Sequence, residues 1–106
     1  MATRTLHDVQ EAIDTLIKEE WQSDYWAPLS NLARLTEEVG ELAREINHHY
    51  GEKPKKASEG EGEIAAELGD ILFTLALLAN SINVDLDTAF EEVMAKYQRR
   101  DAQRWK

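Results

Sequence analysis

The chain has 106 residues, enough for one domain with a modest hydrophobic core. Its formal net charge of −9 disfavours a nonspecific nucleic-acid binder, because such proteins need an electropositive face. The absence of cysteine excludes disulfides and thiolate metal sites and fits a reducing compartment. The N-terminus becomes polar at once, and the longest apolar run, residues 71–79, is far shorter than the ~20 residues of a membrane span. We therefore expect one cytoplasmic domain, residues 1–106, with no membrane or nucleic-acid polymer as partner.

The first two predicted helices follow from apolar spacing and from residues that start or stop helices. The first helix carries the stripe Leu6, Val9, Ile13, Leu16 and Ile17. Thr5 and Asp8 resemble a capping box at its start. The pattern breaks over residues 22–27, and Pro28 suits the first turn of a second helix, which is expected to end before Gly51. The stripe of this second helix is Leu32, Leu35, Val39, Leu42 and Ile46.

Residues 51–62, rich in Lys, Glu and Gly, are predicted to form a flexible loop. The third helix is predicted from about Glu63 to Ser81. Because it is apolar on several sides, it indicates a subunit interface in so short a chain. A fourth helix is expected after Asp85 or Asp87, with these residues facing inward: Phe90, Val93, Met94 and Tyr97. The predicted fold is all-α and four-helix bundle-like, oligomerising through the third helix and its neighbours.

Two acidic pairs lie inside this apolar pattern: Glu38 with Glu41, and Glu67 with Asp70. The members of each pair are three residues apart, so each pair lines one helix face. If the second and third helices are antiparallel neighbours, the two carboxylate rows face each other across a groove. Converging acids repel unless cations intervene, and oxygen donors favour Mg²⁺ or Mn²⁺ over Zn²⁺. From the residues alone, solvated positions on helix flanks stay an alternative, since Glu is a good helix former.

The spacing of these acids resembles a known signature. Glu37-Glu38-Val39-Gly40-Glu41 and then, after about two dozen residues, Glu67-Leu68-Gly69-Asp70 are similar to the EExxE…ExxD signature of MazG-like nucleotide pyrophosphohydrolases, within the all-α NTP pyrophosphatase superfamily. The resemblance covers roughly residues 28–101. It implies four Mg²⁺ ligands, Glu38, Glu41, Glu67 and Asp70, and a less defined role for Glu37. It also implies hydrolysis of a nucleoside triphosphate between the α- and β-phosphorus, with Glu38 or Glu41 as candidate acceptor of the attacking water's proton.

Basic residues supply candidate ligands for the phosphates. The fourth helix ends in Lys96-Tyr97-Gln98-Arg99-Arg100, and MazG-like proteins have a similar phosphate-holding stretch at this place. On that resemblance Lys96 and Arg100 are predicted phosphate ligands, although basic residues in a last turn also offset the helix dipole. Lys53 in the loop is a further candidate, or part of a solvated linker.

Aromatic residues gather just before the second helix, where Trp26 is predicted to stack on the substrate base. Asn31 and Arg34 share the helix face of Glu38 and are further candidates for contacts with the base. The alternative is that the aromatic side chains close the end of a small bundle. The chain departs from the family at Leu77, where MazG-like proteins often have an asparagine, so substrate contacts from the third helix are not carried over.

Three classes of function stay open at this point. The first is a Mg²⁺-dependent nucleoside triphosphate pyrophosphohydrolase, with a role in clearing surplus or non-standard nucleotides. The second is a di-metal carboxylate protein of other chemistry, for which residues 45–48 supply one ExxH unit. The third is a non-catalytic helical interaction module. For the first class the apolar third helix, together with the MazG resemblance, predicts a homodimer or homotetramer.

Overall fold

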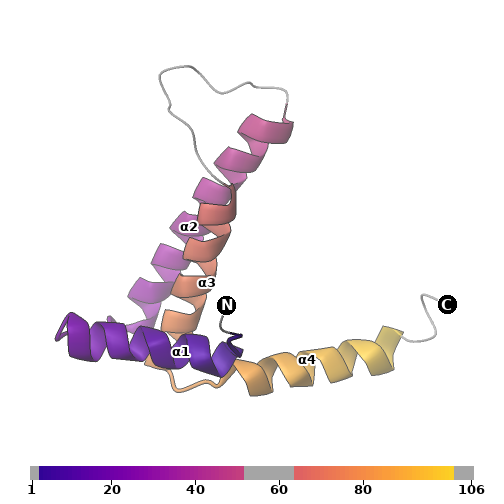
Figure 1. Ribbon diagram of the computed structural model, residues 1–106. Coiled ribbons are helices and arrows are strands. Elements are labelled where there is room, and N and C mark those ends of the chain that lie inside the picture. Colours follow the sequence, from indigo (N-terminus) through magenta and orange to yellow (C-terminus); the bar gives the residue numbers. More distant parts are fainter. Residues whose placement is uncertain (1–2, 52–63, 102–106) are drawn as a thin grey trace.

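The structure is a computed structural model that describes residues 3–51 and 64–101, and these are largely helical (Figure 1). The elements are α1 (Leu6–Thr15), a π-helical turn η1 (Leu16–Glu20), α2 (Pro28–Tyr50), α3 (Ile64–Ser81) and α4 (Leu86–Asp101). The described residues contain no strand, so the all-α prediction is confirmed. The predicted loop, apart from Gly51, lies outside the described residues.

The first helix begins and ends through local hydrogen bonds. The Thr5 hydroxyl accepts the Asp8 N–H and the Asp8 carboxylate accepts the Thr5 N–H, both at 3.0 Å, which confirms the capping box. At the other end the Trp21 N–H donates to the Leu16 carbonyl at 2.8 Å, the five-residue step of a π turn. The chain then turns at Gln22, which has a positive φ of 50°.

Helices α2 and α3 lie side by side and run in opposite directions (Figure 1). Pro28 occupies the first turn of α2, as its fixed φ and missing N–H favour. The buried face of α2 coincides only in part with the predicted apolar stripe. Asn31 and Glu45 are buried and Leu35 and Leu42 are half-buried, whereas Val39 is 49% exposed. Positions 31, 38 and 45 are two helical turns apart, so Glu38 shares the buried face. The face of α2 that packs against α3 therefore carries the Glu38 carboxylate among its half-buried residues.

The hydrophobic core lies where α1, η1 and the second half of α3 meet. Ile13, Ile17, Ala76 and Leu77 are buried there, with Phe73 packed against them. A polar network closes the same end of the molecule. The Gln10 amide nitrogen donates to Asn80 Oδ1 at 2.9 Å and to the Val84 carbonyl at 2.7 Å. The Gln10 amide oxygen in turn accepts the Leu86 N–H at 2.9 Å, which ties α1 to the start of α4.

Helix α3 is largely apolar but is buried only in part. By length and composition it is apolar enough to span a membrane, with mean hydropathy 1.4 over 18 residues, of which 22% are buried. Core helices of soluble proteins meet the same criteria. Its buried residues are Thr74, Ala76, Leu77 and Ala79, whereas Leu68, Leu72 and Leu75 are exposed. The first half of α3 therefore presents an apolar surface to solvent in the single chain.

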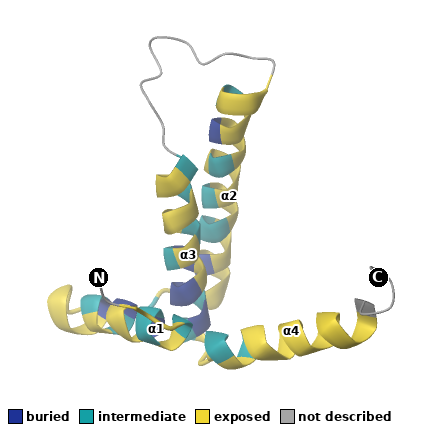
Figure 2. Cartoon of the chain, turned by 45° about the vertical axis from the view of Figure 1, so that its right-hand side comes forward, coloured by how far each residue is buried: buried dark blue, intermediate teal, exposed yellow. Residues whose placement is uncertain are grey.

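Helix α4 extends away from α2 and α3 and packs chiefly against α1 (Figures 1 and 2). The prediction that its apolar residues face inward is wrong for the single chain. Phe90, Val93, Met94 and Tyr97 are 38–52% exposed. The reason lies at the start of the helix, where the Asp87 carboxylate accepts the N–H groups of Leu6 and His7 at 3.2 and 3.1 Å. This contact holds the beginning of α4 against the beginning of α1.

Candidate metal centre

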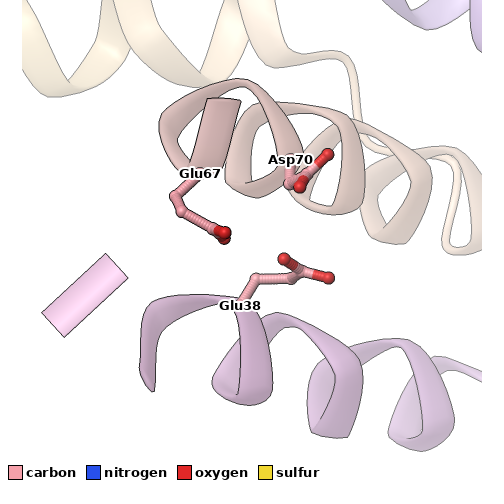
Figure 3. A group of neighbouring side chains, drawn as sticks. All are labelled: Glu38, Glu67 and Asp70. Atoms are coloured by element: carbon pink, nitrogen blue, oxygen red, sulfur yellow. The ribbon is translucent and has the colours of Figure 1, made fainter. Parts of the chain in front are cut away.

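Three of the four predicted metal ligands converge between α2 and α3. Glu38 extends from α2 toward Glu67 and Asp70 on α3 (Figure 3), and one carboxylate oxygen of each lies within 4.8 Å of the other two. Glu38 and Glu67 are half-buried, and Asp70 is exposed. Antiparallel packing produces this meeting, because it places the first two turns of α3 beside the middle of α2. We call these three residues the acid cluster.

In the acid cluster the ionised forms of Glu38 and Glu67 are disfavoured. Burial raises the pKa of Glu38, and the charges of Glu41 and Asp70 raise it further, while Arg34 opposes them. Burial likewise raises the pKa of Glu67, followed by the charges of Glu41 and Asp70. The Oε2 atoms of Glu38 and Glu67 are buried and have no hydrogen-bond partner. Buried carboxylate oxygens without donors are costly unless a cation satisfies them.

The donors of the acid cluster suit a hard divalent cation. All three are carboxylate oxygens, the ligand type preferred by Mg²⁺ and Mn²⁺. The buried oxygens of Glu38 and Glu67 that lack a hydrogen-bond partner are a second observation in favour of a bound cation. Glu45 and His48, the ExxH unit, are not members of this group. The chemistry of the cluster therefore favours Mg²⁺ or Mn²⁺ over a histidine-rich di-iron centre.

Glu41, the fourth predicted ligand, lies beside the acid cluster but outside the group of converging oxygens. It is exposed, and its negative charge contributes to the raised pKa of Glu67. Glu37 is also exposed and adds a smaller charge effect that raises the pKa of Glu38. Glu37 and Glu41 thus lie near the acid cluster but are not part of it.

The three residues predicted to contact the base line one small cavity beside the acid cluster. The cavity measures about 150 Å³, and its walls include Trp26, Asn31 and Arg34. The Arg34 Nε lies 4.0 Å from Glu38 Oε1, so this side chain joins the cavity to the acids. A larger open hollow of about 870 Å³ runs along α1, and none of the predicted acids lines it.

The predicted phosphate ligands do not reach the acid cluster within one chain. Lys96 and Arg100 lie on α4, where their cationic groups sit 5.3 and 5.0 Å from the ring centre of Tyr97. Since α4 extends away from α2 and α3, these cations and the acids are on different parts of the molecule (Figure 1). Lys53 lies outside the described residues.

Further residues form the walls and the surroundings of the cavity. Trp21 and Leu77 also line the cavity, and Leu77 is the position where the chain departs from the family pattern. Tyr25 fills a structural role: its hydroxyl donates to Asp14 at 2.7 Å and accepts from Asn80 Nδ2 at 3.0 Å. Burial and the bond to Asp14 raise the pKa of Tyr25 to about 12. The idea that aromatic residues close the end of the bundle fits Tyr25, whereas Trp26 is 61% exposed.

Comparison with known proteins identifies the family to which this helical scaffold belongs. Residues 27–105 match the MazG nucleotide pyrophosphohydrolase domain, and the chain belongs to this family of hydrolases. The chain is 49% identical to the uncharacterized protein YpjD of Bacillus subtilis (strain 168), with 99% of this chain and 94% of YpjD covered. It is 28% identical to the uncharacterized protein YvdC of the same organism, over 82% of this chain and 92% of YvdC.

Two crystal structures resemble the fold. The structure of YpjD from Bacillus subtilis has a TM-score of 0.82 at 46% identity, covering 95% of this chain and all of that one. The structure of a Bacillus-conserved MazG protein, a nucleotide pyrophosphohydrolase, has a TM-score of 0.76 at 46% identity and covers 95% and 97% of the two chains. The predicted resemblance to MazG-like proteins is therefore confirmed.

Proposed function

We propose that this chain is a Mg²⁺-dependent nucleoside triphosphate pyrophosphohydrolase, with Mn²⁺ able to substitute for Mg²⁺. It cleaves a (d)NTP between the α- and β-phosphorus to (d)NMP and pyrophosphate, and so clears surplus or non-standard nucleotides from the cytoplasmic pool. The observation that carries the proposal is the convergence of Glu38, Glu67 and Asp70, two of which have buried oxygens without a partner. Membership of the MazG family supports the class of reaction.

In this proposal the acids divide the work of the reaction. Glu38, Glu67 and Asp70 hold the divalent ion, which neutralises phosphate charge and makes water a better nucleophile when bound. Glu41 is exposed and lies outside the converging oxygens, so its carboxylate is not committed to the ion and is the proton acceptor in this proposal. The water oxygen attacks the α-phosphorus and its proton passes to the glutamate. The bond from the α-phosphorus to the bridging oxygen breaks, and pyrophosphate leaves.

We further propose that the active form is at least a homodimer, or a homotetramer, in which α4 of one copy supplies Lys96 and Arg100 to the acid cluster of another. Two observations support this arrangement. Within one chain α4 extends away from the acids. In addition, α3 and α4 expose apolar residues, among them Leu68 and Phe90, each 52% exposed. Apolar faces of this kind are covered by a symmetric partner in most small oligomers.

Pyrophosphate release tests the reaction. The protein is incubated with a panel of canonical and damaged triphosphates, with Mg²⁺ or with a chelator, and pyrophosphate is measured. We expect release only with the metal, and we expect Asp70→Asn to abolish it. Glu20→Gln is the matched control, because Glu20 is an exposed acid of η1 outside the acid cluster. If Asp70→Asn keeps full activity, the site assignment is wrong; if no nucleotide yields pyrophosphate, the proposed reaction is wrong.

Mixing two inactive variants tests the shared site. Glu67→Gln lacks an acid and Arg100→Ala lacks a phosphate ligand, so each variant alone is expected to be impaired. A heterodimer of the two contains one intact site if the acids and the cation come from different copies. We therefore expect activity to recover on mixing. No recovery, together with exchange of subunits shown by mass spectrometry, would place both groups in the same copy.

A non-catalytic interaction module stays the alternative function. It accounts for the exposed apolar faces but assigns no use to the unpartnered oxygens of Glu38 and Glu67. Titration of Mn²⁺ separates the two, since an interaction module has no need to bind it.

A further inference from the structure

The acid cluster has a cationic side chain beside it, Arg34 of α2. Arg34 stands one helical turn before Glu38, and its Nε lies 4.0 Å from Glu38 Oε1. The side chains are 42% exposed for Arg34 and 15% exposed for Glu38, so a half-exposed guanidinium approaches a carboxylate that is mostly covered. Arg34 also lines the cavity of about 150 Å³. Its side chain therefore lies at the border between the cavity and the acid cluster.

The two carboxylate oxygens of Glu38 have different surroundings. Oε1 is the oxygen near Arg34, whereas Oε2 is buried and has no hydrogen-bond partner. The charge of Arg34 favours the ionised form of Glu38 and opposes the rise in the pKa of that residue. At Glu67, burial and the neighbouring acids raise the pKa. Arg34 thus offsets negative charge on one member of the cluster, Glu38, and does so from the side of Oε1.

The pair of Arg34 and Glu38 contributes little to the stability of α2 itself. Within a helix the favourable order places the acid first and the cation four residues later, and here the cation comes first. A distance of 4.0 Å is long for an ion pair, and pairs with an exposed member add little to the free energy of unfolding. What the pair does change is the charge at the point where the three carboxylates of the acid cluster converge.

We propose that Arg34 is a positioning residue of the metal site: it is the resident counter-cation of Glu38 and competes with the divalent ion for that carboxylate. The inference rests on the proposed function for the ion itself, which the acid cluster would hold. Before an ion binds, Arg34 offsets the repulsion that the other acids exert on Glu38. Once Glu38 holds a divalent ion, like charges meet at one carboxylate, so each cation binds Glu38 at the expense of the other. Arg34 therefore lowers the affinity of the site for the ion.

Titration of Mn²⁺ into Arg34 variants, with free Mn²⁺ measured by electron paramagnetic resonance, tests the competition. Arg34→Gln removes the opposing charge, so we expect Mn²⁺ to bind on the order of tenfold tighter than to the wild type. Arg34→Lys keeps the charge and should restore the wild-type Kd. Arg4→Gln, which removes an exposed arginine ahead of α1, is the matched control and should leave the Kd unchanged. Because the Arg34 side chain is 42% exposed, added salt should reduce the difference between wild type and Arg34→Gln.

The results of this titration distinguish competition from other roles of Arg34. Weaker binding of Mn²⁺ to Arg34→Gln overturns the inference, because a side chain that orients a metal ligand supports metal affinity. An unchanged Kd, an Arg34→Lys variant that behaves like Arg34→Gln, or a difference that salt does not reduce overturns it as well.

Urea unfolding in a chelator shows whether the pair is structural. We expect nearly equal midpoints for the wild type and Arg34→Gln, and a large loss of stability in the variant would contradict the inference. If Mn²⁺ binds tighter to Arg34→Gln but the wild type cleaves no triphosphate, the proposed reaction fails and the competition stands. If the wild type releases pyrophosphate while the Kd for Mn²⁺ is the same in both proteins, the competition alone fails.

Discussion

Carboxylates gather in two regions of this molecule, and their pKa values are shifted in opposite directions in the two regions. In the acid cluster, burial and neighbouring charges raise the pKa of Glu38 and Glu67. At the joint between α1 and α4, which we define by His7, Asp8, Asp85 and Asp87, hydrogen-bond donors surround the acids instead. The Thr5 backbone lowers the pKa of Asp8, and the Thr88 hydroxyl and N–H lower that of Asp85.

The difference is the one expected between carboxylates that bind an ion and carboxylates that stabilise the fold. Donors at the joint come from the chain itself: Asp87 accepts two backbone N–H groups, and Asp85 accepts the Thr88 N–H at 3.0 Å. In the acid cluster, Glu38 and Glu67 each keep a buried oxygen without a donor. The carboxylates of the joint have hydrogen-bond donors, whereas two buried oxygens of the acid cluster have none. Unsatisfied polar groups of this kind concentrate at functional sites. Removing an acid should therefore affect activity in one region and stability in the other.

Glu67→Gln is expected to have the largest effect, and on activity alone. Outer-shell partners of metal ligands are worth ~10–100-fold, so loss of a ligand should lower pyrophosphate release by at least ~100-fold. Without metal the same change relieves repulsion from Glu41 and Asp70, so the free energy of unfolding should stay equal or rise. Urea unfolding in a chelator measures the second quantity. Clear destabilisation in the chelator would show that the cluster acids are structural and would remove the contrast between the regions.

Metal should stabilise the wild type and leave the Glu67→Gln variant nearly unchanged. An ion that binds only the folded state adds ~2.7 kcal/mol to the free energy of unfolding at 100 times its Kd. Urea unfolding with increasing Mn²⁺ measures this gain. Glu20→Gln, with the exposed acid of η1 removed, is the control and should show the same gain as the wild type. An equal gain in Glu67→Gln would place the ion elsewhere.

Asp87→Ala should give the opposite result to Glu67→Gln. It removes the carboxylate that accepts the N–H groups of Leu6 and His7, and acceptors at helix starts are worth ~0.5–2 kcal/mol. The free energy of unfolding should fall by about that amount, measured with urea, while the Kd for Mn²⁺ stays unchanged. Glu92→Ala, an exposed acid on the same helix, is the control and should leave stability unchanged. If Asp87→Ala has no effect on stability, α4 takes its direction from other contacts.

Sequence patterns predicted what depends on near neighbours in the chain. The Thr5–Asp8 capping box, Pro28 in the first turn of α2 and the convergence of Glu38 with Asp70 all follow from local spacing and a short connection. The direction of α4 does not, because it depends on Asp87, which contacts residues about 80 positions away.

The buried polar residues were missed for a related reason, although the sequence held a signal. Gln10 stands between Leu6 and Ile13 at helical spacing, in a position where an apolar side chain is expected. Only the fold supplies its partners, Asn80, Val84 and Leu86, which come from the other end of the chain. Asn31 on α2 was predicted to contact the base, but its burial was not predicted. Polar residues at core spacing were therefore the available sign of both the network and the cavity.

His7 provides the smallest and most specific test, through pH. Its Nδ1 lies 3.2 Å from Asp85 and its Nε2 lies 2.9 Å from Glu11, so both ring nitrogens face carboxylates and the charged ring is favoured. These contacts raise the pKa of His7 above its ordinary 6.5. A raised pKa means that the stabilisation is fully present below about pH 6.5 and is lost as the pH rises through the folded-state value.

The free energy of unfolding of the wild type minus that of His7→Gln should therefore be larger at pH 5.5 than at pH 9. Both partners are exposed, so the difference is expected to be small and to shrink with added salt. Equal differences at pH 5.5 and 9 would mean that His7 is held by neutral hydrogen bonds. The joint would then stabilise its acids through the Thr5 and Thr88 donors alone, with no part for an ion pair.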